Sequence, residues 1–381
     1  MPDLQEVVDR LHAWYPPETA EEWDAVGLVW GEPEAQVSKV MFAVDPTLEV
    51  AEEAAAWGAD LLVVHHPLFL KPVHGFAAST PKGRTLSTLV GAGCALLAAH
   101  TNADQAVDGV SEAMALALGL SELRSLVPAP APAVDSLVVY VPGPDAERLR
   151  QVLSEAGAGA LGDYDQCSYS TPGEGRFRPL AGSDPAIGEH GRLEVVAEER
   201  IEVVLPRRLR QQVVQAMLAA HPYEEPAFQV LELADARQAG TGTGRVGTVG
   251  PTTLAEFART VGERLPATVQ GVRVAGDPER PVRTVAVVGG AGDFLLDRVA
   301  GMDVDVYVTS DLRHHPASEF VEKGGPALVD VAHWAAEWTW LPVVERRVRE
   351  TWGDTVETRV STARTDAWTF AVPQEPHSEG A

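Results

Sequence analysis

The sequence predicts an α/β protein, with a discontinuous α/β domain of two related halves and an inserted α+β domain between them. Three observations support this. Short apolar runs alternate with helical patterns over residues 1–126 and again over 245–372, as in βαβ units. A different pattern fills residues 134–235. A Pro-Ala segment at 127–133 and a Gly-Thr segment at 239–244 flank this insert and are typical of linkers.

In the first half, apolar residues at helical spacing alternate with short buried runs. Leu4, Val7, Val8 and Leu11 mark the first helix. By the same criteria we expect helices over 4–14, 48–57, 85–92 and 110–118, and strands over 40–44, 60–64 and 94–99.

In the insert we expect strands over 135–141, 192–196, 201–206 and 228–233, and helices over 146–156 and 207–220. After residue 245 the first pattern resumes. We expect helices over 254–265 and 295–300, and strands over 282–289 and 304–309. The two segments outside the insert are therefore expected to build one domain.

The composition excludes several classes of protein. The 381 residues include 30 Lys and Arg against 55 Asp and Glu, a formal net charge of -25. Binding to nucleic acid or to an anionic membrane needs the opposite charge, so neither is expected. Two distant cysteines give no disulfide framework, and the N-terminus lacks a signal core. No window resembles a membrane span, so a cytoplasmic protein is expected.

Histidines and carboxylates follow the apolar runs at three places. His65 and His66 follow one run, and His100 and Asp104 follow the next. His333 and Glu337 follow a third, four residues apart and so on one face of a helix. Ligands of open α/β sheets bind at the carboxyl ends of strands. Five N and O ligands drawn from these six residues suit one or two transition metals better than calcium or a thiolate zinc site.

Each of these residues also has a simpler interpretation. Histidines without a metal are common, Asp104 could cap a helix, and His333 with Glu337 could be a solvated pair. A fourth cluster, Thr309 to His315, holds Asp311, which could orient an imidazole, and two histidines that could act as acid or base or lie on a plain surface. The run Gly289 to Gly292 could cradle a phosphate or form a tight turn.

Together these motifs resemble the dinuclear metal family named after the Ngg-interacting factor three, whose members are also named GTP cyclohydrolase 1 type 2 homologues. The resemblance rests on residues 63–67, 100–104 and 309–315, and on His333 with Glu337. It implies two divalent metal ions per chain, zinc, iron or manganese. The implied ligands are His65, His66, Asp104, His333 and Glu337, with Glu337 bridging and His100 and Asp311 nearby. It also implies a ring-shaped homohexamer.

The insert resembles P-II and CutA proteins. This likeness rests on Gly162 to Tyr164, on Gly175-Arg176-Phe177-Arg178-Pro179, and on His221-Pro222-Tyr223-Glu224-Glu225-Pro226.

The function expected from this family is metal-dependent hydrolysis of a nucleotide or phosphoester-like small molecule. Two metals can activate water, and His100 or His315 could serve as catalytic acid or base. GTP as substrate is implied by the resemblance alone, and no residues are assigned to an organic cofactor. The alternative is a non-catalytic metal-binding or regulatory ring protein, or a scaffold that recruits partners.

Overall fold

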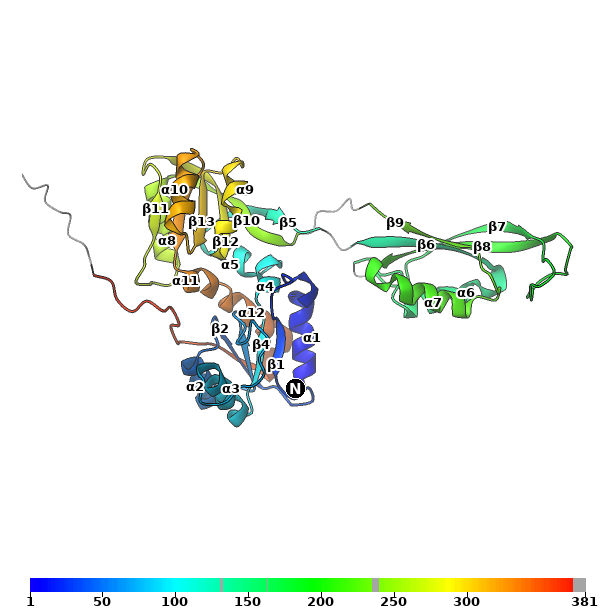
Figure 1. Ribbon diagram of the computed structural model, residues 1–381, viewed down its shortest axis with the longest axis horizontal. Helices are drawn as coiled ribbons and strands as arrows, with labels where there is room; N and C mark the ends of the chain where they lie inside the picture. Colours follow the sequence, from blue (N-terminus) through cyan, green and yellow to red (C-terminus); the bar gives the residue numbers. More distant parts are fainter. Residues whose placement is uncertain (131–132, 163, 235–239, 373–381) are drawn as a thin grey trace, which may run out of the picture. The chain divides into compact units, whose positions relative to one another are not determined.

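The computed structural model describes residues 1–130, 133–162, 164–234 and 240–372. It separates into two compact units, one built from Met1–Ala129 with Gly240–Ala381 and the other from Pro130–Ala239. Figure 1 shows both units, with most of their elements labelled. Within the described residues, no helix is long and apolar enough to cross a membrane.

The first unit contains a five-stranded sheet in the order β1-β4-β3-β2-β15. All neighbours in this sheet are parallel except the edge pair of β1 and β4. The strands and the helices that accompany them are α1 (Leu4–Trp14), β1 (Gly27–Trp30), β2 (Lys39–Ala43), α2 (Leu48–Trp57), β3 (Leu61–Val64), α3 (Pro81–Ala92), β4 (Ala95–Ala98) and β15 (Glu357–Val360).

A six-stranded sheet in the order β11-β14-β13-β12-β10-β5 completes this unit. Its centre, β12 to β14, is parallel, and the outer pairs are antiparallel. Its elements are α4 (Thr101–Gln105), α5 (Val110–Ala117), β5 (Ser121–Pro128), β10 (Gly242–Thr253), α8 (Leu254–Arg264), β11 (Arg273–Ala275), β12 (Pro281–Ala291), α9 (Leu296–Ala300), β13 (Val306–Ser310), α10 (His314–Glu322), β14 (Ala327–Val331), α11 (His333–Trp338) and α12 (Leu341–Trp352).

Local sequence explains where these helices begin and what they bury. Asp3 caps α1 in a capping box with Glu6, and the apolar face of the helix, Leu4, Val7 and Leu11 included, is buried. The strands β3 and β4 are buried along their whole length, as expected for central parallel strands. Each of the two chain segments of this unit adds one strand to the sheet that the other mainly builds. The strand β5, before the insert, joins the six-stranded sheet, and β15, after the insert, joins the five-stranded sheet.

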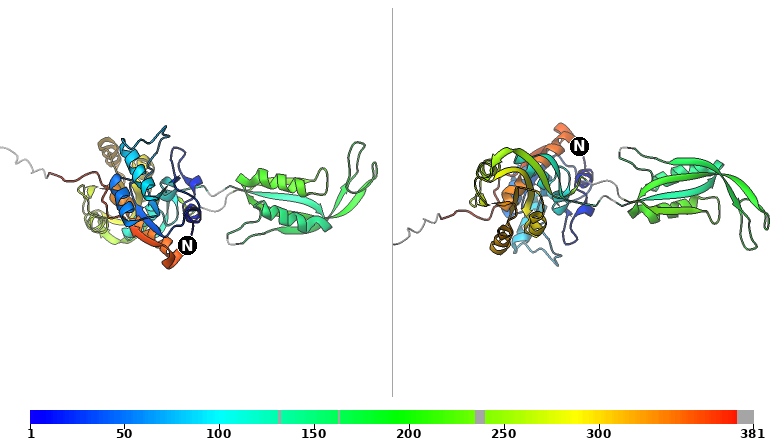
Figure 2. Two further views of the ribbon diagram at one scale, coloured as in Figure 1. Left: turned by 90° about the horizontal axis from the view of Figure 1, so that it is seen from below. Right: turned by 90° about the horizontal axis from the view of Figure 1, so that it is seen from above.

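The second unit is an antiparallel sheet in the order β7-β8-β6-β9 with two helices on one face. Its elements are β6 (Val134–Pro142), α6 (Ala146–Glu155), β7 (Tyr169–Phe177), β8 (Glu194–Pro206), α7 (Arg210–Ala220) and β9 (Phe228–Glu232). Leu137, Val139 and Ile201 of the sheet pack against Leu149 and other residues of the helices. The two helices lie side by side along the sheet, and the β7–β8 ribbon extends beyond them (Figure 2).

Several sequence predictions need correction. The strands expected at 192–196 and 201–206 are one continuous strand, β8. The linker expected at 239–244 is shorter, because β10 begins at Gly242 and pairs with β5. Several elements were not predicted at all, among them β1, β5, β7, β10, α10, α12 and β15. The segment Gly289–Ala291 belongs to β12 rather than to a turn before a helix.

Candidate metal centre

Three histidines meet at the carboxyl edge of the first sheet. His65 and His66 follow β3 directly, and His100 follows β4 after one intervening residue. Because β3 and β4 are parallel neighbours, with Val64 opposite Ala98, their ends lie at the same edge. The ring of His65 lies 5.0 Å from that of His66 and 5.1 Å from that of His100. The end of the strand lets adjacent residues converge, as expected from the sequence.

The second sheet contributes a carboxylate to the same place. His333 begins α11, two residues after β14 ends, and Glu337 lies one helical turn later. One carboxylate oxygen of Glu337, Oε1, lies 2.6 Å from His333 Nε2 and 3.4 Å from His65 Nε2. The other, Oε2, lies 3.2 Å from His66 Nε2. Glu337 therefore contacts imidazoles that come from both sheets.

Asp104 completes the set of residues predicted as metal ligands. It lies in α4, and its Oδ1 is 3.7 Å from His65 Nε2. Ligand atoms of His65, His66 and His100 all lie within 4.8 Å of one another, and so do those of His66, His333 and Glu337. All five predicted ligands and His100 are thus brought together, although His65 and Glu337 lie 272 residues apart in the chain.

Each histidine of this cluster is held by a hydrogen bond at Nδ1. The acceptors are Ala99 O for His65 at 3.0 Å, Asp45 for His66 at 2.8 Å, Asp24 for His100 at 2.8 Å and Asp311 for His333 at 2.7 Å. Carbonyl and carboxylate oxygens only accept, so each Nδ1 carries the hydrogen. This fixes the ring orientation and leaves Nε2 as the atom that a cation could bind.

Buried polar atoms without partners mark the centre of the cluster. His65 Nε2, Asp104 Oδ1 and Glu337 Oε2 are buried and find no hydrogen-bond partner within the described part of the chain. Such an atom costs roughly 1–3 kcal/mol, and a cation would satisfy all three. Imidazole nitrogens and carboxylate oxygens suit zinc, iron or manganese. The residues present therefore fit a divalent transition metal.

The charges of the cluster shift the acidity of its members. Burial lowers the pKa of His66, but the Glu337 charge and the hydrogen bond to Asp45 outweigh this and raise it to about 10. The same balance, with Glu337 and Asp311, raises the pKa of His333 to about 11. Burial also opposes ionisation of Glu337, yet the surrounding imidazoles hold its pKa well below the usual range. Protons on these imidazoles take the place that a cation would occupy.

Burial and the Glu337 charge have the opposite effect on Asp104, whose pKa they raise well above its usual value. With Glu337 ionised and no cation beside it, the protonated form of Asp104 is therefore favoured. A cation would favour the carboxylate form of both residues.

Two backbone positions are shaped around Glu337 and His333. Gly290 has φ +78°, and a Cβ there would lie 2.6 Å from Glu337 Oε1 and 3.4 Å from His333 Nε2. Asp311 has φ +58°, which is uncommon for a non-glycine residue, and it accepts the hydrogen bond from His333. Close approach to the cluster therefore accounts for Gly290. Gly292, the last glycine of the run, directly precedes the short helix Asp293–Leu295.

A cavity of about 420 Å³ opens onto the cluster and reaches His100, Asp104, His333 and Glu337. Trp23 and Phe294 also line it, although they are 58% and 66% exposed. Glu21 and Asp293 add negative charge, and none of the described residues that line the cavity is Lys or Arg. A small molecule entering here meets aromatic surface and carboxylates before it reaches the cluster.

Two predicted histidines lie away from the cluster, and two residues that hold its imidazoles were not predicted. His314 and His315 are exposed in the first turn of α10, with their rings 5.1 Å apart, and no recorded contact within the described residues joins His315 to the cluster. Asp24 and Asp45 were missed. Asp45 follows β2 and could have been found by the strand-end rule. Asp24 precedes β1 in a loop and gives no such signal.

Comparison with known proteins identifies a family for this chain. A family model described as Duf34/NIF3 (NGG1p interacting factor 3) matches residues 2–367. A Mycobacterium tuberculosis protein named GTP cyclohydrolase 1 type 2 homolog is 48% identical over 96% of both chains. A Bacillus subtilis protein of the same name is 38% identical over 87% of this chain and 88% of its own.

Two solved structures share the fold over nearly the whole chain. A Bacillus cereus protein related to NIF3 is 35% identical, with a TM-score of 0.78, over 97% of this chain and 99% of its own. A Staphylococcus aureus protein is 25% identical, with a TM-score of 0.79 and the same coverage. The chain belongs to the DUF34/NIF3 family.

Proposed function

We propose that this protein is a metal-dependent hydrolase with a dinuclear centre of zinc, iron or manganese, acting on a nucleotide or phosphoester-like small molecule. The main support is the position of Glu337, whose two oxygens approach three imidazoles from two sheets. Relatives named GTP cyclohydrolase 1 type 2 homolog are consistent with a hydrolytic role.

The ligands we assign are His65, His66, Asp104, His333 and Glu337, with Glu337 between the two ions. When bound, two divalent ions lower the pKa of a water molecule and polarise a substrate oxygen. The protein's own part is to hold the imidazoles by their Nδ1 hydrogens and to present a cavity of about 420 Å³ beside them.

His100 is the residue we assign to proton transfer. It lines the cavity, and its Nδ1 donates to Asp24, so Nε2 is the atom that gains or loses the proton. Burial would raise the pKa of Asp24, but hydrogen bonds from His100 and Thr101 hold it well below the usual range. Asp24 therefore stays ionised and keeps the ring in position. His315, exposed on α10, stays a prediction without a supporting contact.

The test is a turnover screen of metal-loaded protein against nucleotides and phosphoesters, with metal content measured on the same samples. We expect His100→Gln to lower turnover by roughly 10²–10⁴-fold, the usual contribution of general acid–base catalysis. His74→Gln, which changes an exposed histidine outside the cluster, is the matched control and should leave turnover unchanged.

Two results would contradict the proposal in different ways. Protein that holds two ions and turns over none of the substrates would favour the metal-binding or regulatory alternative. Protein that binds fewer than two ions at saturating metal would contradict the dinuclear centre itself.

The P-II/CutA character of the insert and the homohexamer also remain proposals, supported by the motifs of the sequence. Light scattering that gives six times the mass of one chain would support the ring, and a monomer would exclude it.

A further inference from the structure

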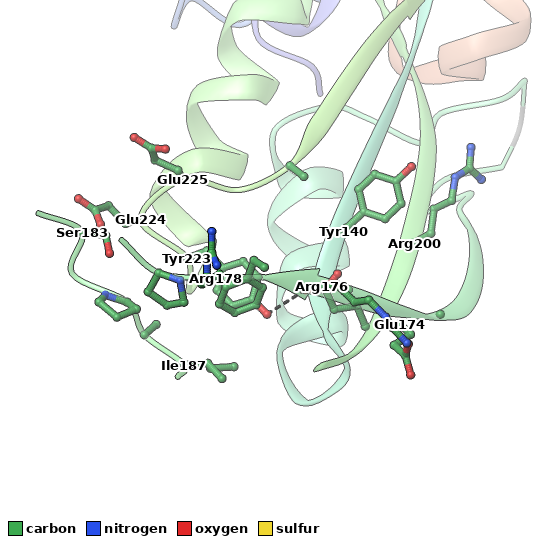
Figure 3. Close-up of a pocket in the computed structure, with 18 of the residues that line it drawn as sticks. Tyr140, Glu174, Arg176, Arg178, Ser183, Ile187, Arg200, Tyr223, Glu224 and Glu225 are labelled. Atoms are coloured by element: carbon green, nitrogen blue, oxygen red, sulfur yellow. Dashed lines mark hydrogen bonds and ion pairs between the residues drawn. The ribbon is translucent and has the colours of Figure 1, made fainter. Parts of the chain in front are cut away.

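Two motifs of the insert, neither used by the metal centre, meet at one cavity. The segments Gly175-Arg176-Phe177-Arg178-Pro179 and Tyr223-Glu224-Glu225 both line a space of about 830 Å³ (Figure 3). Small-molecule sites have volumes of about 300–1,000 Å³, so this space suits a ligand. Every lining residue lies between Tyr140 and Ala227, inside the second unit. The cavity is therefore complete without any residue of the metal-binding unit.

One wall of this cavity is apolar. The rings of Phe177 and Tyr223 lie edge to face, with centroids 5.5 Å apart, and Pro179 beside them is buried. Ile187 lines the cavity from the segment that follows β7. The backbone N–H of Asp184 donates to Glu224 at 2.8 Å and ties that segment to the Tyr223 motif. The wall offers a surface for an apolar or aromatic group.

The carboxylate of Glu198 is the polar group beside this wall. It accepts a hydrogen bond of 2.9 Å from the Tyr223 hydroxyl through Oε1. Burial and the Glu198 charge raise the pKa of Tyr223, so the hydroxyl keeps its proton and donates. A Cβ on Gly175 would overlap the Glu198 carboxylate, so glycine is what allows the carboxylate to lie over β7. Its other oxygen, Oε2, can accept from a ligand.

The cations of the lining differ in whether they already have a partner. Arg176 pairs with Glu174 at 2.6 Å, and Arg200 pairs with Glu202 at 2.6 Å. Within the part of the chain that the structure describes, no carboxylate is in ion-pair contact with Arg178. The lining thus offers the guanidinium of Arg178 for an anion, and the Glu198 carboxylate, which lies beside the apolar wall, for a cation.

We propose that this cavity binds an amino-acid-type zwitterion with an apolar side chain. Arg178 would hold the ligand's carboxylate, for which its planar fork is suited. Glu198 would accept from the ammonium group, and Phe177 with Tyr223 would contact the side chain. A nucleotide fits less well, because its phosphates would face Glu174, Glu198, Glu224 and Glu225 with one unpaired guanidinium to offset them.

Calorimetry on the full chain tests this, with L-phenylalanine as the probe. 3-Phenylpropionate lacks the ammonium group, 2-phenylethylamine lacks the carboxylate, and AMP represents the nucleotides. We expect L-phenylalanine to bind at least about 10-fold more tightly than either analogue, since each lacks one charge-assisted contact. The same affinity is expected after the metal has been removed, which separates this site from the metal centre.

Three variants assign the contacts. Arg178→Gln should weaken L-phenylalanine about 10-fold and leave 2-phenylethylamine unchanged. Gly175→Ala should push the flexible Glu198 carboxylate aside, and so weaken L-phenylalanine but not 3-phenylpropionate. Arg192→Gln is the matched control, because Arg192 lies in the same segment but does not line the cavity.

The proposal is overturned if L-phenylalanine gives no binding up to about 10 mM, well above the 1 mM that corresponds to 4.1 kcal/mol of binding free energy. It is also overturned if AMP binds more tightly than L-phenylalanine, or if Arg178→Gln and Arg192→Gln behave alike.

Discussion

At the scale of single residues, the cluster is arranged before any cation arrives. Four imidazoles are each fixed through Nδ1, and Glu337, 3% exposed, lies among three of them. Fixing the rings in advance reduces the entropy that binding must overcome. The remaining cost lies in buried atoms of His65 and Asp104 that have no hydrogen-bond partner among the described residues, and a cation would remove it.

Glu337 should matter more for metal content than any single histidine. Removing a carboxylate that approaches three imidazoles leaves two cations with less charge between them, so the weaker ion should leave. We expect Glu337→Ala to lose more metal than His66→Ala, and to lose any hydrolytic turnover with it. Metal content measured on both variants, with folding checked by circular dichroism, decides this. If Glu337→Ala keeps both ions and His66→Ala loses both, the bridging assignment is wrong.

Metal binding should release protons. In the metal-free protein His66 and His333 have pKa values of about 10 and about 11, so both are protonated at neutral pH. A metal binds the neutral rings and favours the carboxylate form of Asp104, so loading should release roughly two to three protons at pH 7, and affinity should fall as the pH falls. Calorimetry in buffers of different ionisation enthalpy counts these protons. A heat of binding that does not depend on the buffer would show that the imidazoles are already neutral.

The raised pKa values of His66 and His333 also determine how the stability of the metal-free protein changes with pH. His66 and His333 have higher pKa values in the folded state than the value of about 6.5 expected in the unfolded chain. Their protonation therefore stabilises the folded metal-free protein. This stabilisation is complete below pH 6.5 and is lost as the pH rises through 10 to 11. The metal-free protein should therefore lose stability on going from pH 7 to pH 11 through these two residues.

We expect Gly290 to be needed for metal binding, because any side chain at this position would collide with the Glu337 carboxylate. In Gly290→Ala the new Cβ would meet Glu337 Oε1 at 2.6 Å, and φ at +78° adds strain of about 1–2 kcal/mol. The control is Gly324→Ala, which has φ +69° and nothing within 4 Å of the new Cβ. We expect both variants to lose stability to denaturant but only Gly290→Ala to lose metal. Equal metal content in the two variants would show that strain alone explains Gly290.

At the scale of elements, the strands that carry the histidines were predicted well because they are buried on both faces. Central parallel strands read as continuous apolar runs, and β2, β3 and β4 lie within a residue or two of the expected positions. The strand-end rule then located His65, His66 and His100. Helices α1 and α2 were predicted residue for residue, since each has a capping residue and an apolar face.

The missed strand β7 lacks such a signal because pairing with its neighbour, and not burial, forms it. The strand β7 contains Pro172, Gly173 and Gly175 and is largely exposed, yet it pairs with β8 over nine residues. Charged residues 198–200 look like a break in β8, but the strand is paired on both sides there. The roles of Asp24 and Gly290 were not predicted for a related reason, since both roles depend on contacts with residues far along the chain.

Arg245 is another residue whose role only the fold reveals. It is 1% exposed, and its guanidinium donates to Glu112 and to the carbonyls of Ala106, Gly242 and Gly244. It therefore fixes β10 to α5 and to the end of α4 from inside the core.

Losing this side chain should destabilise the first unit. We expect Arg245→Ala to cost about 3–5 kcal/mol, because it leaves several buried carbonyls and part of Glu112 without a donor. Arg124→Ala, on exposed β5 beside it, should change stability by less than about 0.5 kcal/mol. Denaturant unfolding compares the two. A similarly small loss of stability in both variants would contradict this, and would mean that water can satisfy the carbonyls that Arg245 contacts.

At the scale of the whole molecule, the insert leaves and re-enters the first unit at neighbouring positions. Pro128 of β5 lies opposite Gly242 of β10, and the N–H of Ala129 donates to Thr241 at 3.0 Å. The insert also has a core of its own, in which Leu149 and Met217 are fully buried. Neither core cluster of the first unit that surrounds the metal ligands includes a residue of the insert.

Removal of the insert should therefore leave the metal centre intact. We expect a chain in which residues 130–239 are replaced by Asn-Gly, a dipeptide that favours tight hairpins, to fold and to bind as much metal as the parent. The excised segment expressed alone should unfold in one cooperative transition, because its sheet and helices share one core. Metal analysis and denaturant unfolding of both pieces measure this. If the shortened chain loses its metal or unfolds, the insert is part of the metal-binding fold, and the two units described here are not independent.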